Sequence, residues 1–254
     1  MKRVQYCSII LLSIIAFGCS NNTETTSESA VSEPESAEVV EEIQELPAVC
    51  VWDKLAVRDN PGDKGQWITS LSIGESIKYL GVDSVSGKKT YGKIALNDGK
   101  VGWARTDLIV IDAKPAVMVN DTDIYKRPDL LTKSDEKFSK MNIVAVMNTQ
   151  DSWSEVKGKR SEGTWVDQGW VKSSNLSFEA VDIATAKFAL AALNIKDESG
   201  RLEAINEILE NVDLGRSKFI GDLEVMAIDL TTEEEEISVD EESLEQTEET
   251  DSIE

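Results

Sequence analysis

The sequence predicts a mainly β fold with a small α-helical segment: two tandem small β-barrels at residues 48–112 and 113–178, followed by a short helical hairpin at 179–230. Two observations predict this order. Between residues 48 and 178 the chain repeats itself at one constant spacing, which takes Pro61 to Pro128, and each copy consists of short apolar stretches separated by turn residues. That pattern is typical of small antiparallel barrels. From residue 179 onward, the apolar residues instead recur at helical spacing.

The amino-terminal segment, residues 1–18, has the build of an export signal. Lys2 and Arg3 form a basic start, and the apolar run that follows is too short to span a bilayer as a permanent helix. The tetrapeptide Ala16-Phe17-Gly18-Cys19 resembles the lipobox of exported bacterial lipoproteins, although Phe17 is bulkier than the usual residue there. The resemblance implies that Cys19 is lipidated and tethers an otherwise soluble chain to a membrane. The alternative is an ordinary secretory signal in which Cys19 has no special role.

Two acidic tails account for most of the formal net charge of −22. Residues 20–47 carry eight Glu and no Lys or Arg, and residues 231–254 carry twelve acidic and no basic residues. The stretch from 48 to 230 holds 28 acidic and 24 basic residues, a net charge of −4. Both tails contain few large apolar residues, so we expect a disordered tether at 19–47 and a disordered tail at 231–254. This charge distribution offers no basic surface for nucleic acid.

Each copy contains four predicted strands in the same order. These are residues 55–61, 76–82, 91–94 and 102–104 in the first copy, and 123–128, 143–149, 153–156 and 169–171 in the second. Asn97-Asp98-Gly99 predicts a tight hairpin before the last strand of the first copy. The matched residues include Pro61 with Pro128, Gly102 with Gly169, and Trp103 with Trp170.

Both copies resemble bacterial Src-homology-3-like (SH3-like) domains, and the resemblance covers about half of the chain. In the first copy it is carried by Val57-Arg58, Gly74-Glu75, Tyr91-Gly92-Lys93-Ile94 and Asp98-Gly99-Lys100-Val101-Gly102-Trp103-Ala104. In the second it is carried by Trp153-Ser154-Glu155-Val156 and Gly169-Trp170-Val171, while Met141-Asn142 replaces the Gly-Glu pair. Tyr91 stands where the family usually has Trp. The resemblance implies that the barrels bind peptidoglycan peptides or protein segments through a loop-rimmed aromatic groove.

Four aromatic residues are the candidate ligand contacts. Trp103 and Trp170 either fix the last strand of each barrel as core residues, which the sequence favours, or touch the ligand directly. We expect Tyr91 and Trp153 near the mouth of the groove, because their strand alternates and follows a variable loop. Trp67 and Trp165 lie in polar loops, where an aromatic side chain is either a lid over the barrel or a recognition residue; this choice stays open.

The helical segment predicts a hairpin that docks on the second barrel. Val181, Ala184 and Phe188 fall on one face of a first helix, and its many alanines allow close packing. A second helix covers residues 202–212, and a third, shorter helical turn is expected around residues 220–227.

An enzymatic role is not indicated, because the chain has no His and keeps only Cys50 as a free thiol after the signal is removed. Neither a His-dependent triad nor a structural zinc site can be assembled, and Gly62-Asp63-Lys64-Gly65 is a turn rather than a phosphate-binding loop. No cofactor is implied. We therefore expect a lipid-anchored, non-catalytic cell-envelope binding protein. The alternative is an adaptor or scaffold lipoprotein that docks an envelope protein through its helical segment or acidic tail.

The residue after Cys19 bears on location. Ser20 stands where inner-membrane retention in enteric lipoproteins calls for Asp, which favours the outer membrane if the host is a diderm bacterium. Whether the protein then faces the periplasm or the cell surface stays open, as does its oligomeric state.

Overall fold

The structure, a computed structural model, describes residues 45–232. All of the described residues belong to one compact unit. The predicted export signal with Cys19, nearly all of the predicted tether and nearly all of the acidic tail lie outside the described residues. These predictions therefore stay predictions.

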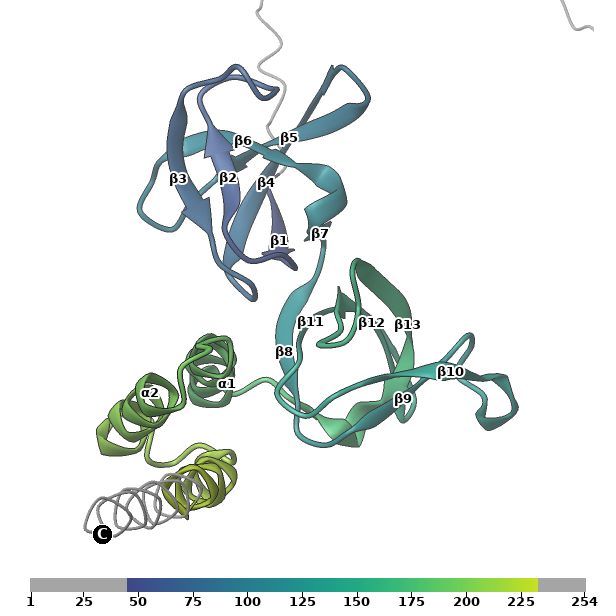
Figure 1. The fold of residues 1–254 in the computed structure, drawn as a ribbon. Helices are drawn as coiled ribbons and strands as arrows, with labels where there is room; N and C mark the ends of the chain where they lie inside the picture. The colour runs from purple at the N-terminus through teal and green to yellow at the C-terminus, as the bar shows by residue number, and fades with distance from the viewer. Residues whose placement is uncertain (1–44, 233–254) are drawn as a thin grey trace, which may run out of the picture. The chain divides into compact units, whose positions relative to one another are not determined.

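The first copy forms a seven-stranded antiparallel sheet that curls around an apolar core (Figure 1). Its strands are β1 (Leu46–Cys50), β2 (Leu55–Arg58), β3 (Trp67–Leu71), β4 (Ser76–Ser86), β5 (Lys89–Ala95), β6 (Val101–Arg105) and β7 (Ile109–Ile111). They lie side by side in the order β3-β2-β6-β5-β4-β1-β7. The predicted hairpin at residues 97–99 is confirmed, since Gly99 adopts a φ of 83° and its N–H donates to the carbonyl of Leu96.

The second copy repeats this topology strand for strand. Its strands are β8 (Lys114–Met118), β9 (Thr122–Tyr125), β10 (Lys133–Phe138), β11 (Ile143–Gln150), β12 (Trp153–Lys159), β13 (Val166–Lys172) and β14 (Leu176–Ser177). The order β10-β9-β13-β12-β11-β8-β14 is that of the first sheet with every strand advanced by seven. The internal repeat therefore extends to the folded structure, and the first strand begins at Leu46, slightly before the expected start of the barrel at residue 48.

Three short 3₁₀ turns accompany the strands. They are η1 (Thr106–Leu108), η2 (Leu130–Thr132) and η3 (Ser173–Asn175). The turns η1 and η3 occupy matching places before the last strand of each sheet, whereas η2 lies at the tip of the β9–β10 hairpin and has no counterpart among the described residues of the first copy.

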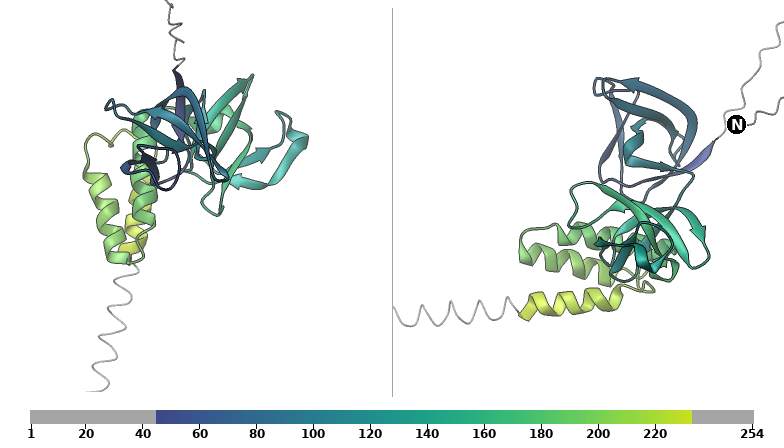
Figure 2. Two further views of the ribbon diagram at one scale, coloured as in Figure 1. Left: turned by 90° about the horizontal axis from the view of Figure 1, so that it is seen from above. Right: turned by 90° about the vertical axis from the view of Figure 1, so that its right-hand side faces the viewer.

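The carboxyl-terminal part of the described chain is helical: α1 (Ala180–Leu193), α2 (Glu198–Glu210) and residues 220–232. The three helices lie side by side (Figures 1 and 2). Their shared apolar cluster includes Val117 and Ile143 of the second sheet, so the predicted docking on the second copy is confirmed. The prediction of a mainly β fold with a small α-helical segment is likewise confirmed.

The predicted buried face of α1 is wrong by about one residue. Ala186, Ala189 and Ala192 are buried, whereas Phe188 is exposed. The reason is that small side chains let the helix backbone approach its neighbours closely, and a phenylalanine ring does not fit at that distance. In the described part of the chain no helix is both long and apolar enough to cross a bilayer.

A buried carboxylate ties the helices to the second sheet. Asp182, in the first turn of α1, accepts hydrogen bonds from the hydroxyls of Ser177 and Ser217 and from the N–H of Lys218. These partners come from β14 and from the approach to the third helix. The Lys218 ammonium lies 3.5 Å from the same carboxylate. One side chain thus joins three segments of the chain.

Candidate ligand-binding site

The Gly-Trp dipeptides decide which aromatic side chains face outward. Gly102 lies opposite Ile94 in the first sheet, and a Cβ atom there would stand 2.5 Å from Val57 Cγ1. Gly169 occupies the same place in the second sheet, where a Cβ atom would stand 2.4 Å from Ile124 Cγ2. Only glycine fits at these inward positions. The tryptophan that follows each glycine must point to the opposite face, because side chains alternate along a strand.

The expectation that Trp103 and Trp170 are core residues is therefore wrong. Both are only partly buried, and neither belongs to the apolar cluster of its sheet. They lie on the outside of the sheet, where part of each side chain is exposed to solvent. The inward position that the sequence assigned to the tryptophan is taken by the glycine before it.

The same rows of side chains occur on the outside of both sheets. The first outer face, as we define it, consists of the side chains of Arg58, Tyr91, Lys93, Trp103 and Arg105. The second outer face consists of those of Tyr125, Trp153, Glu155, Trp170 and Lys172. Trp103 lies between Arg58 and Lys93 across the strands, and Trp170 lies between Tyr125 and Glu155. In the next row Tyr91 faces Arg105, and Trp153 faces Lys172. The sequence thus placed Tyr91 and Trp153 in equivalent strands correctly, although the two are out of register within the repeat.

Tyr91 and Trp153 are buried, at 4% and 7% exposure, rather than lying open at a groove mouth. Neither ring belongs to the apolar core of its sheet. Both are covered from outside instead: the β2–β3 loop reaches Tyr91 through Asp63, and Tyr125 and Lys172 contact Trp153. That Tyr91 and Trp153 lie near the mouth of a groove stays a prediction. The half-buried tryptophans beside them are more accessible.

The first outer face is closed at its tyrosine end by the β2–β3 loop. The Tyr91 hydroxyl donates to Asp63 Oδ1 at 3.2 Å, and the Arg58 guanidinium donates to the carbonyl of Gly65 at 2.7 Å. Burial, and then the hydrogen-bonded Asp63, raise the pKa of Tyr91. The other end is open, because Trp67 lies across from Arg58 and is 64% exposed. An exposed tryptophan beside an arginine can stack on a planar group of a ligand while the guanidinium pairs with an acidic one.

The second outer face carries three aromatic rings. Tyr125 and Trp153 meet edge to face, with centroids 4.8 Å apart, and the Lys172 ammonium lies 3.6 Å from the centroid of Trp153. Glu155, beside Trp170, accepts a hydrogen bond from Gln168. A face with aromatic, cationic and acidic groups can hold an apolar side chain together with a carboxylate and an amine.

The sequence prediction missed Tyr125 and Lys172. The signal that finds them is the repeat itself, because the spacing that takes Trp103 to Trp170 also takes Arg58 to Tyr125 and Arg105 to Lys172. Trp165 also has a defined contact: it packs on Trp52 with ring centroids 5.4 Å apart, so it is a packing residue more than a lid.

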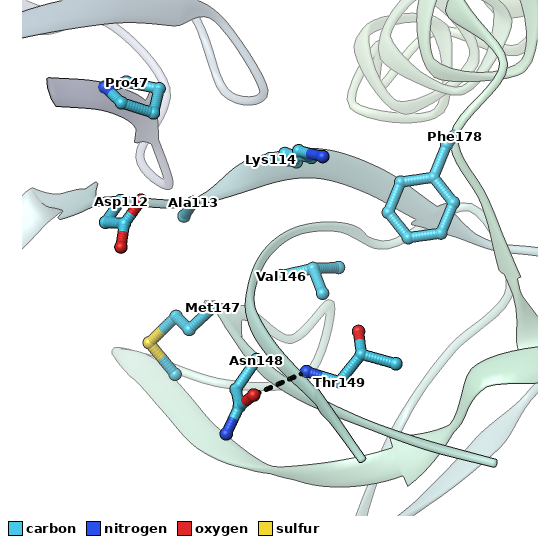
Figure 3. Close-up of a pocket in the computed structure, with 9 residues that line it drawn as sticks. All are labelled: Pro47, Asp112, Ala113, Lys114, Val146, Met147, Asn148, Thr149 and Phe178. Atoms are coloured by element: carbon cyan, nitrogen blue, oxygen red, sulfur yellow. Dashed lines mark hydrogen bonds between the residues drawn. The ribbon is translucent and has the colours of Figure 1, made fainter. Parts of the chain in front are cut away.

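Two cavities lie away from the outer faces. One, of about 540 Å³, lies between Ala113, the end of β11 and Phe178; Figure 3 shows the Phe178 ring at one end and Met147 at the other. The second, of about 380 Å³, lies against the last turns of α1 and includes Lys159 and Lys187. None of the four predicted contact residues lines either cavity.

The described residues contain no cluster of His, Cys, Asp or Glu suited to a metal ion. Cys50 is buried, and its thiol donates to the carbonyl of Trp52. Burial raises the pKa of this thiol to about 12, so it is protonated at neutral pH and is a poor nucleophile.

No protein-family model and no curated protein matches the chain. Among solved structures, NlpC2 from Trichomonas vaginalis is 10% identical, covering 65% of this chain and 57% of its own, with a TM-score of 0.23. NlpC1 from the same organism is 11% identical, covering 64% and 62%, with a TM-score of 0.22. The CBD of endolysin LysPBC5 is 14% identical, covering 55% and 98%, with a TM-score of 0.22. The chain spans less than two thirds of either NlpC protein, and TM-scores this low do not establish a shared fold.

Proposed function

We propose that this protein is a lipid-anchored, non-catalytic cell-envelope binding protein that recognises peptidoglycan peptides or protein segments through its two outer faces. One observation carries the proposal: the same rows of outward-facing aromatic and charged side chains recur, strand for strand, on two sheets of identical topology. The half-buried Trp103 and Trp170 are the contact residues that we assign to the two faces.

The chemistry of the faces favours a short peptide. The first outer face combines Trp103 with Arg58 and Lys93, which suits a carboxylate beside an apolar or planar group. The second adds the acid Glu155, which suits an amine. Two weak sites on one chain would also raise the overall affinity for a ligand that is repeated along a polymer, since the second contact becomes intramolecular.

The non-catalytic assignment is supported by residue chemistry. The sequence has no His, and the one cysteine in the described residues is buried with a raised pKa. The resemblance of residues 16–19 to a lipobox supports the anchor at Cys19, and Ser20 supports an outer-membrane location in a diderm host.

Retention of the full-length protein on insoluble peptidoglycan sacculi tests the proposal. We expect Trp103→Ala and Trp170→Ala each to weaken retention about tenfold, the usual effect of removing an aromatic hot spot, and the double variant to weaken it further. Phe188→Ala, which removes an exposed aromatic ring from α1, serves as the matched control and should bind normally. Equal retention of all variants, or no retention of the wild-type protein at low salt, would contradict the proposal.

A second candidate is an adaptor role for the helical segment. Exposed apolar side chains lie on the helices, namely Phe188, Val225 and Ile228, and such side chains are typical of protein contacts. In this case a photo-crosslinker at position 188 should capture an envelope protein in cells, and one at position 170 should not.

A further inference from the structure

The tip of the β9–β10 hairpin displays two adjacent leucines to solvent. Leu130 is 62% exposed and Leu131 is 93% exposed, both within the 3₁₀ turn η2. The hairpin extends away from the rest of its sheet in both Figures 1 and 2. The matching loop of the first copy, residues 59–66, contains no aliphatic side chain other than Pro61. The exposed pair is therefore a feature of the second copy alone.

Hydrogen bonds hold the two leucines outward. The Asp129 carboxylate accepts from the N–H of Leu131 at 3.0 Å and caps the turn. The Thr132 hydroxyl bonds the carbonyls of Arg127 and Asp129, and the N–H of Lys126 donates to the carbonyl of Thr132. These bonds define the conformation of the turn in which both leucines face solvent.

Cations flank the leucines. Lys126 and Arg127 precede the turn and form no ion pair within residues 45–232, whereas Lys133 on the other side is paired with Asp123. Among residues 45–232, the tip therefore combines a protruding apolar point with two cations that form no ion pair and one acid, Asp129, whose carboxylate accepts from the N–H of Leu131. A bilayer with anionic headgroups offers the complement to both.

We propose that this tip inserts into the interfacial region of an anionic phospholipid bilayer. A single turn is far too small to supply the roughly 800 Å² that a stable protein partner buries on each side. A bilayer, in contrast, accepts a protruding point: Leu130 and Leu131 enter the acyl boundary while Lys126 and Arg127 stay at the headgroups. The inference goes beyond the peptide-binding role of the outer faces and does not depend on it.

The test uses full-length protein reconstituted into vesicles of four parts phosphatidylcholine to one part phosphatidylglycerol. An environment-sensitive dye is attached to Leu131→Cys or, as matched control, to Val212→Cys. Val212 is 91% exposed but lies beside Glu210 and Asp213, which anionic lipid repels. The parent protein without an added cysteine measures labelling of the native thiols.

We expect a blue shift and strong quenching by brominated lipids at position 131, and neither at position 212. Lys126→Gln and Arg127→Gln should each lower the ratio of inserted to free tip about fivefold, an effect that disappears in pure phosphatidylcholine. Equal quenching at positions 131 and 212, or quenching that is unchanged by the charge variants, would overturn the proposal. So would a blue shift that appears only when envelope proteins are added, because the tip would then be a protein contact.

Discussion

Replacing Asp182 with Asn is the sharpest test of how the helices are held on the second sheet. The Asp182 side chain is 2% exposed and accepts hydrogen bonds from Ser177, Ser217 and the backbone of Lys218. Asparagine has nearly the same shape as aspartate. Its amide NH2 group is a hydrogen-bond donor, however, and it would face the Ser177 hydroxyl, which donates to the carboxylate in the wild-type protein. The substitution therefore removes charge-assisted hydrogen bonds without leaving a cavity.

The expected loss is about 2–4 kcal/mol of unfolding free energy at pH 7, since a hydrogen bond to a charged group contributes about 1.5–3 kcal/mol. The Lys218 ammonium adds little, because its side chain is 58% exposed. Burial alone would raise the pKa of Asp182, but hydrogen bonds from Ser177, Lys218 and Ser217 outweigh burial and lower it. A lowered folded-state pKa means stabilisation that is present above the unfolded-state pKa of about 3.9 and is lost as the pH falls through the folded-state value.

Urea unfolding followed by two signals measures this loss. All six tryptophans lie at or before residue 170, so fluorescence reports the sheets, whereas circular dichroism at 222 nm reports mainly the helices. We expect the 222 nm midpoint to fall by roughly 1 M urea or more at pH 7, and the difference from wild type to shrink below about pH 4. Asp229→Asn, at an exposed position in the third helix, should change nothing. A difference below about 0.5 kcal/mol at pH 7 would refute the reasoning.

Two further outcomes follow from packing. Gly169→Ala should destabilise the protein by about 1–3 kcal/mol in thermal or urea unfolding, because the new methyl group clashes with Ile124. Gly221→Ala should stabilise it by about 0.5–1 kcal/mol, because Gly221 lies in a helix and a Cβ atom there has no neighbour within 4 Å. If both variants behave alike, the inward register of Gly169 is wrong. With the other two cysteines replaced by Ser, the Cys50 thiol should resist a thiol reagent at pH 8 until urea unfolds the chain, and rapid labelling of the native protein would contradict its burial.

Much of the fold follows from local signals in the sequence. The repeat could be predicted because Pro61, Gly102 and Trp103 recur at one spacing, and the central strands because their apolar residues alternate. The opening strands β1 and β8 were missed for a physical reason. β1, for example, lies between two neighbouring strands and is buried at its end. Its sequence is therefore a short apolar run directly after an acidic tether, without the alternation of apolar and polar residues that identifies a half-buried strand.

The candidate site could be predicted in composition but not in orientation. The four aromatic residues do lie on the outer faces, yet Trp103 and Trp170, which the sequence favours as core residues, are more exposed than Tyr91 and Trp153. Which residue of a Gly-Trp pair points into the core depends on how close the neighbouring strand lies. At Gly102 the close neighbour is Val57, which leaves room only for glycine. That distance is a tertiary property, and a single sequence does not contain it. The loop that covers Tyr91 through Asp63 is equally non-local.

The alternation of an inward glycine with an outward tryptophan has a consequence for evolution. Since the residue that lets the strands approach and the residue that meets a ligand are separate neighbours, selection can rewrite the surface of either sheet while its interior stays intact. Substitutions on the outer faces of such repeated modules can therefore change what each module binds without disturbing its core. In this chain Trp103 is flanked by Arg58 and Trp170 by Tyr125, which is the kind of difference that such substitutions produce.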